Sequence, residues 1–212
     1  MCSSPFNMLR ALALILLVAF YASGAAAEEI LVTCGSVVKL RHVATGYDLH
    51  SHEISYGSGS GQQSVTGFQD TSDANSLWVV TGAQEADCVQ GTPIKSGTAV
   101  RLQHVATRRW LHSHHFPSPL SQNLEVSAFG NDKESDHLDN WEVQFSGSYW
   151  LQDKKVKLKH IETGGFLSSS ADRRYGRPIG GQLEICGKKK AGKTEDWMAT
   201  EGIFFPERTD VA

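Results

Sequence analysis

The sequence predicts an all-β protein in which three equivalent units share one core. Three observations support this prediction. Apolar residues alternate with polar ones at a period of two, the intervening segments are rich in Gly, Pro, Ser and Asp, and the same blocks occur three times in the same order. Alternation at period two is typical of half-buried strands. After residue 28 no segment has the sustained periodicity of a helix.

The first repeated block is a predicted strand followed by a turn. It occurs as VVKLRHVATG at 37–46, AVRLQHVATR at 99–108 and KVKLKHIETG at 155–164. In the first copy Val38, Leu40 and His42 share the face expected in the core, while Lys39 and Arg41 share the outward face. Because each copy has a Thr three residues after its His, we expect a neutral imidazole that hydrogen-bonds the turn and has a structural role.

Three further landmarks follow in every unit. The second block is LHSH at 49–52, LHSH at 111–114 and LSSS at 167–170. The third is QSVTGF at 63–68, QNLEVSAF at 122–129 and QLEIC at 182–186, and each unit ends on a tryptophan, Trp78, Trp141 or Trp197. We expect these tryptophans in the core. Four landmarks repeated in order at similar spacing indicate true internal repeats.

Each unit therefore contains about four short strands, and one such unit cannot bury its apolar face alone. Three four-stranded units match a β-trefoil, a closed barrel capped by hairpins. A propeller is the alternative, but closed propellers have about four or more blades. We predict a trefoil over residues 28–205, with repeats at about 33–87, 88–150 and 151–205 and a tail at 206–212.

The first 27 residues are predicted to be a signal peptide. Arg10 precedes an apolar stretch at 11–21, and small residues end in Ala25-Ala26-Ala27. This order is typical of a cleaved secretory signal, and the apolar stretch is short for a membrane span. We expect cleavage after Ala27 and no membrane span in the mature chain.

Charge and cysteine content limit the partners and the compartment. With 20 Lys plus Arg against 23 Asp plus Glu, the net charge is −3, which disfavours a nucleic-acid partner. Of the four cysteines, Cys2 lies in the predicted signal. In a closed barrel the end of one unit returns near its beginning, so we predict a Cys34–Cys88 disulfide and a shielded, free Cys186.

The repeated blocks resemble the MIR motif, which forms β-trefoils in protein O-mannosyltransferases and in the inositol trisphosphate and ryanodine receptors. The resemblance rests on His-x-x-Thr-Gly, Leu-His-Ser-His and the closing Trp, and it covers residues 33–205. A signal peptide followed by three such units resembles the stromal cell-derived factor 2 family of the endoplasmic reticulum (ER) lumen. The mannosyltransferases need many membrane spans and the receptors are far longer chains, so neither matches this chain.

This resemblance implies a non-enzymatic component of a chaperone complex. Its implied partners are the lumenal chaperone BiP, a J-domain co-chaperone and unfolded clients, in protein quality control and the response to ER stress. A lectin-like protein that binds O-mannosyl or other glycans is the alternative. Some relatives end in a retrieval signal of the HDEL type, whereas this chain ends TDVA. Retention would then depend on a partner, and partial secretion stays open.

The candidate surface for a partner or a glycan contains two His pairs and several side chains that we expect to be exposed. Its residues are His50, His52, Arg109, Trp110, His112, His114, Arg173 and Arg174. Two imidazoles could begin a zinc site, but such sites need three or four ligands, and the third unit has Ser168 and Ser170 instead. We therefore predict no metal, no cofactor and no catalytic residue. Trp110 is expected to be the exposed aromatic of this surface, whereas the Gln-x-Trp signature of ricin-type lectins is missing.

Overall fold

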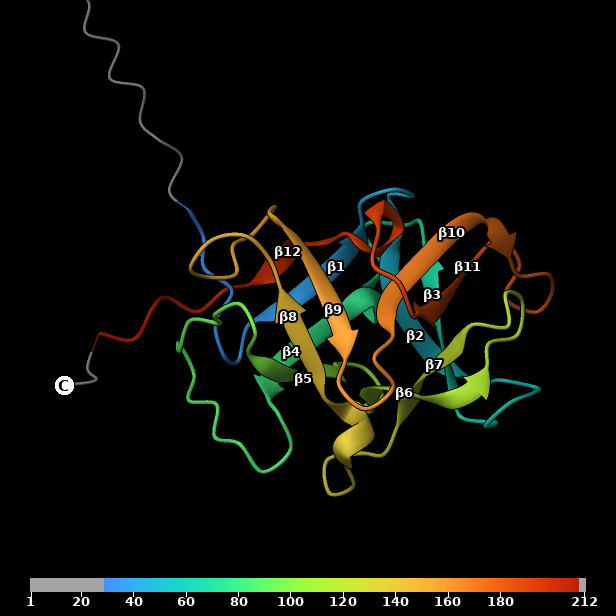
Figure 1. The fold of residues 1–212 in the computed structure, drawn as a ribbon, viewed down its shortest axis with the longest axis horizontal. Helices are drawn as coiled ribbons and strands as arrows, with labels where there is room; N and C mark the ends of the chain where they lie inside the picture. The colour runs from blue at the N-terminus through green and yellow to red at the C-terminus, as the bar shows by residue number, and fades with distance from the viewer. Residues whose placement is uncertain (1–28, 210–212) are drawn as a thin grey trace, which may run out of the picture.

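The computed structural model describes residues 29–209, which fold into twelve strands and three short 3-10 helices (Figure 1). The predicted signal peptide and the last residues of the tail lie outside the described residues. The elements are β1 (Val37–His42), β2 (Asp48–Ser55), β3 (Gln63–Phe68), η1 (Ala74–Ser76), β4 (Leu77–Gly82), β5 (Ala99–His104), β6 (Trp110–Pro117), β7 (Leu124–Phe129), η2 (His137–Asp139), β8 (Trp141–Gln144), β9 (Lys155–His160), β10 (Phe166–Arg174), β11 (Leu183–Lys188), η3 (Lys193–Glu195) and β12 (Trp197–Ile203).

Six strands close a barrel. β1 pairs with β4, β4 with β5, β5 with β8, β8 with β9, β9 with β12, and β12 returns to β1, all antiparallel. The other six strands form three hairpins, and their second strands, β3, β7 and β11, pair with one another. A closed barrel covered by a threefold set of hairpins is a β-trefoil, which confirms the predicted fold and rejects the propeller. Figure 1 shows both ends of the described chain leaving on the side away from these hairpins.

The barrel core has the predicted composition. Val38, Leu40, Leu102 and Leu158 are fully buried, with their counterparts from all three repeats. Trp78, Trp141 and Trp197 are also fully buried, and each indole Nε1 donates a hydrogen bond to a strand carbonyl at 2.9 Å, that of Leu49, Leu111 or Leu167 respectively. The three tryptophans therefore pin each hairpin to the barrel.

The outward face of β1 differs from the expectation. Lys39 is only 6% exposed, because Thr71 and Glu201 lie over it and its Nζ donates to the Thr71 carbonyl and pairs with Glu201. Arg41 is half-buried and donates twice to the Asp48 carboxylate, at 2.9 and 3.1 Å. Loops and strand ends from elsewhere in the chain thus cover a face that period-two alternation assigns to solvent.

The repeated histidines have the expected structural role. In His42, Nδ1 lies 2.9 Å from the Thr45 hydroxyl and Nε2 lies 2.8 Å from the Thr194 carbonyl oxygen. A carbonyl can only accept, so Nε2 carries the proton and Nδ1 accepts from the hydroxyl. His104 and His160 make the same pair of contacts, to Thr107 and the Asn75 carbonyl, and to Thr163 and the Leu138 carbonyl. Each imidazole thereby joins its own turn to a one-turn helix of the preceding repeat or, for His42, of the third.

These three imidazoles are held neutral. Burial is the main cause that lowers the pKa of His42 and of His104, and it lowers the pKa of His160 to about 4. The centroid of each imidazole ring lies 4.8–4.9 Å from the ring centroid of a core tryptophan. Protonation of any of them would place a charge at the edge of the apolar core.

Cys34 and Cys88 are joined by a disulfide, as predicted, with their Cα atoms 5.6 Å apart. The bridge ties the entry to β1 to the segment that leads from β4 into β5. Cys186 is free and buried in β11, also as predicted. Burial raises the pKa of its thiol to about 11, so it is protonated at neutral pH.

Replacing Leu102 by Ala should lower the free energy of unfolding by about 2–5 kcal/mol, because the side chain is fully buried in the barrel. Lys155→Ala is the control, since this Lys side chain is 63% exposed, and we expect a change within about 0.5 kcal/mol. Urea unfolding followed by tryptophan fluorescence measures both. Equal losses would show that the alternation of buried and exposed positions is misassigned.

Candidate functional site

The two His pairs form buried polar networks at the junction between hairpin and barrel. In repeat one, His50 Nδ1 lies 2.7 Å from Asp73 Oδ2, and His50 Nε2 lies 2.9 Å from Nδ1 of His52. The outer nitrogen of His52 lies 2.9 Å from the hydroxyl of Ser64. Burial lowers the pKa of His50 and lowers that of His52 to about 4. The chain Asp73–His50–His52–Ser64 is therefore a continuous hydrogen-bonded relay between neutral rings.

Repeat two has a similar network with a second acid. His112 Nδ1 lies 2.9 Å from Asp139 Oδ1, and His114 Nε2 lies 3.2 Å from Glu125 Oε1. Glu125 occupies the position of Ser64, as the register of the two hairpins shows. The same carboxylate accepts from the backbone N–H and hydroxyl of Ser60, so it also fixes the hairpin loop of repeat one.

Repeat three replaces both imidazoles by serines. Ser168 donates to Glu195 at 2.9 Å, as His112 does to Asp139, and Ser170 donates to Asp172 at 2.9 Å. Glu184, the counterpart of Glu125, accepts from the backbone N–H groups of Leu120 and Ser121 through Oε1, at 2.7 and 3.1 Å. Its other oxygen, Oε2, is buried without a hydrogen-bond partner among residues 29–209.

Half of the eight residues of the predicted surface are inside the protein. His50, Trp110, His112 and His114 are each at most 8% exposed. The expectation that Trp110 is exposed is wrong. Its Nε1 donates to the Asn131 carbonyl at 2.9 Å, and the guanidinium of Arg101 covers the ring at 4.4 Å from its centroid.

The four other residues of that predicted surface differ in exposure. His52 and Arg109 are half-buried, and Arg173 and Arg174 are exposed. Arg174 donates to the Tyr47 hydroxyl and to the Gly181 carbonyl, at 2.8 and 2.6 Å, so it has a structural task. Arg173 makes no hydrogen bond or ion pair within the described part of the chain and stays available to a partner.

Sequence reasoning missed the acids that hold these networks. They are Asp73, Glu125, Asp139, Glu184 and Glu195. Two of them, Asp139 and Glu195, lie two residues before the closing Trp, at the position of Ser76 in repeat one. An acid at that spacing opposite a His or Ser of the second block is the signal that could have found them.

His112, Asp136 and Asp139 form the one cluster with metal-ligand chemistry within residues 29–209, with candidate ligand atoms within 4.8 Å of one another. Hydrogen bonds account for this cluster. Asp139 accepts from His112, from the Ser135 hydroxyl and from the Asp136 backbone N–H, while Asp136 caps the one-turn helix through the Leu138 N–H. We assign the cluster a capping role.

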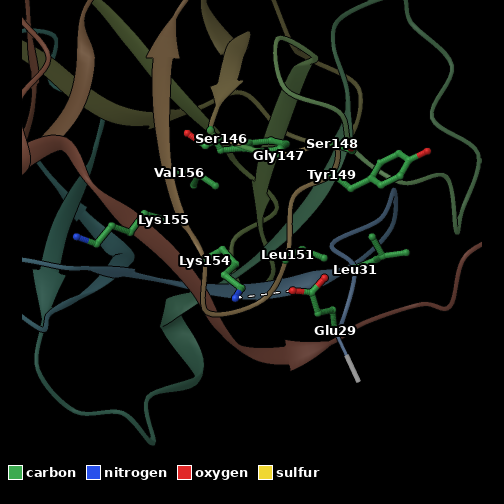
Figure 2. Close-up of a pocket in the computed structure, with 11 residues that line it drawn as sticks. Glu29, Leu31, Ser146, Gly147, Ser148, Tyr149, Leu151, Lys154, Lys155 and Val156 are labelled. Atoms are coloured by element: carbon green, nitrogen blue, oxygen red, sulfur yellow. Dashed lines mark ion pairs between the residues drawn. The ribbon is translucent and has the colours of Figure 1, made fainter. Parts of the chain in front are cut away.

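A cavity of about 780 Å³ lies at the barrel end where the described chain begins and ends. Figure 2 shows Glu29 turned towards Lys154 across its mouth, at 3.8 Å, while Lys155 points away. Leu31, Phe145, Tyr149 and Val156 supply apolar wall. Ile30, between Glu29 and Leu31, is 44% exposed, and Ile203, the last residue of β12, is 60% exposed. This end of the barrel therefore combines apolar side chains with two lysines.

Comparison with known proteins places these features in a family. The MIR domain model matches residues 49–196. Stromal cell-derived factor 2 of Homo sapiens is 50% identical over 192 residues, which cover 91% of this chain and 90% of the human protein. The chain belongs to the stromal cell-derived factor 2 family. The family assignment agrees with the resemblance inferred from the repeated blocks.

Two solved structures extend this similarity. The crystal structure of the family member from Arabidopsis thaliana superposes with a TM-score of 0.82 at 48% identity, over 84% of this chain and 99% of that one. A structure of a protein O-mannosyltransferase complex of S. cerevisiae bound to the sugar donor superposes with a TM-score of 0.75 at 27% identity, over 89% of this chain and 28% of that chain. Within residues 29–209 no helix is long and apolar enough to cross a membrane.

Proposed function

We propose that this protein is a non-enzymatic binding component of an ER-lumenal chaperone complex, with a J-domain co-chaperone, BiP and unfolded clients as partners. The observation that carries the proposal is membership of the stromal cell-derived factor 2 family along nearly the whole length of both chains. The Cys34–Cys88 disulfide supports an oxidising compartment, because such bonds persist in secretory proteins and are rare in the cytosol.

The three turn histidines and the polar network of repeat one support a binding role over catalysis. A general base needs a free nitrogen that faces a substrate. In His42, His104, His160 and His50 both ring nitrogens already have protein partners, and His52 has His50 on one side and Ser64 on the other. His42, His104 and His160 join neighbouring repeats, whereas His50 and His52 belong to a network within repeat one.

Affinity purification of the tagged protein from lumenal extract tests the proposal. We expect a J-domain co-chaperone and BiP to be recovered in amounts comparable to the bait, and recovery to fall for Arg173→Glu, which reverses a free exposed charge. Arg177→Glu is the matched control, since Arg177 is also exposed and lies in the next loop. Recovery of neither chaperone would contradict the proposal.

Glycan binding is the second candidate. It is favoured by the similarity to the mannosyltransferase structure, which is bound to a sugar donor and of whose chain 28% superposes on this trefoil. A glycan array separates the two candidates. Saturable binding of a mannosylated glycan, with no chaperone recovered from lumenal extract, would reverse the ranking.

A further inference from the structure

A second, polar cavity of about 220 Å³ lies between the β10–β11 hairpin and the loop at 118–123 of repeat two. Its wall includes Ser121, Asn123, Ser170, Arg173, Glu184 and Cys186. Glu184 is only 1% exposed, and its Oε2 has no hydrogen-bond partner among the described residues. A buried carboxylate oxygen without a donor is destabilising by about 1–3 kcal/mol or more, so an unpartnered oxygen on a carboxylate that lines a cavity points to a guest that donates to it.

The pseudo-threefold symmetry shows what this cavity lacks. In the strand pairs, His50 lies opposite Thr66, His112 opposite Ser127 and Ser168 opposite Cys186, which fixes the equivalence of the three hairpins. Ser170 is therefore the counterpart of His52 and His114. Nε2 of His52 lies 2.9 Å from the Ser64 hydroxyl, and Nε2 of His114 lies 3.2 Å from Glu125 Oε1. Ser170 instead donates to Asp172, so no side chain at this position contacts Glu184 Oε2.

We propose that the cavity beside Glu184 is a socket for a histidine side chain that a partner polypeptide supplies. The guest imidazole would donate to Glu184 Oε2, in the way that His114 faces Glu125, and would occupy the space left by Ser168 and Ser170. The inference deepens the proposed role in partner binding, and its biological use rests on that role. Imidazole binding itself is measured on the purified protein alone.

The chemistry of the wall favours this guest over a sugar. No aromatic side chain lines the cavity, so the wall lacks the flat apolar face on which a pyranose ring stacks. The wall contains two cationic side chains, Lys188 and Arg173. Lys188 is already placed 3.2 Å from the Thr194 hydroxyl and 3.4 Å from Glu195, and Arg173 makes no hydrogen bond or ion pair with Glu184. Neither cation therefore donates to the open oxygen of Glu184, and the N–H of an imidazole ring can do so.

The direct test is titration of the ¹⁵N-labelled protein with imidazole and with the tripeptide Gly-His-Gly, with Gly-Ala-Gly as the negative probe. We expect saturable shifts of the amide resonances of Leu120, Ser121, Asn123 and Ser170 for the two imidazole-bearing probes only. Shifts that grow without saturation, or that are the same for Gly-Ala-Gly, would overturn the proposal. Saturable shifts of these amides with methyl mannoside in place of imidazole would overturn it as well.

Two variants make the assignment specific. Ser170→His restores the missing ring, so it should abolish imidazole binding and raise the unfolding midpoint. Glu184→Gln should weaken imidazole binding at least tenfold while its amide oxygen still caps the loop at Leu120. Glu125→Gln is the matched control in repeat two and should leave the affinity unchanged. Unaltered binding by Ser170→His would disprove the socket, whatever the chaperone purification gives.

Discussion

Replacing Cys34 and Cys88 together by Ala is expected to lower the free energy of unfolding by about 4 kcal/mol. The bridge joins residues 54 apart in sequence, and in the chain-entropy model a closed loop of this size restricts the unfolded chain by roughly that amount. Since the bridge ties the start of β1 to the exit of β4, its loss also frees the seam between the first two repeats. Urea unfolding of the oxidised protein and of the double variant measures the difference.

Cys186→Ala is the control for this experiment, because the thiol is free and buried and takes no part in the bridge. Its effect should be well below that of the double variant. Peptide mapping without reduction should give a Cys34–Cys88 linkage and an unpaired Cys186. A linkage that includes Cys186 would contradict the placement of the repeat ends.

Acidification from pH 7 to 4.5 should destabilise the protein, with on the order of 2–3 kcal/mol from His160 alone. Burial lowers the pKa of His160 to about 4, whereas an unfolded histidine titrates near pH 6.5. Between these values the unfolded chain binds more protons than the folded one. The stabilisation is therefore complete above about pH 6.5 and is lost as the pH falls towards 4. His42, His104, His50 and His52, whose pKa values are also lowered, act in the same direction.

The measurement is the free energy of unfolding in urea at pH 7.0, 6.0, 5.2 and 4.5. His160→Gln keeps a group that can donate to the Leu138 carbonyl but cannot titrate, so its stability should fall less over this range. A control, His115→Gln, changes an exposed histidine and should follow the wild-type curve. A wild-type stability that does not change between pH 7.0 and 4.5 would contradict the neutral buried imidazoles.

The fold was largely predictable because the sequence pattern of one four-stranded unit occurs three times in the chain. Period-two alternation around Leu40 and its counterparts located the barrel strands, and the repeats implied closure. The one-turn helices before each Trp were not predicted, since three residues are too few to carry a helical period. Their caps, such as Asp73 and Asp136, were the available local signal.

The candidate site was less predictable. The buried positions of His50, His112 and Trp110 depend on packing between hairpins from different repeats, which local alternation does not encode. The cavity beside Glu184 arises where repeat three departs from the others. That departure is visible in the sequence as LSSS in place of LHSH. The sequence alone does not show that this departure leaves a cavity beside Glu184, because the loop groups that bind Glu125 and Glu184 come from the preceding repeats.

Calorimetric titration of the purified protein with a J-domain co-chaperone of the ER lumen tests most directly whether this trefoil acts by binding a chaperone partner, as we propose. We predict saturable binding with a defined stoichiometry, weakened by Arg173→Glu and unchanged by Arg177→Glu. No heat of binding to the co-chaperone, with or without BiP, together with saturable binding of a mannosylated glycan, would contradict the account.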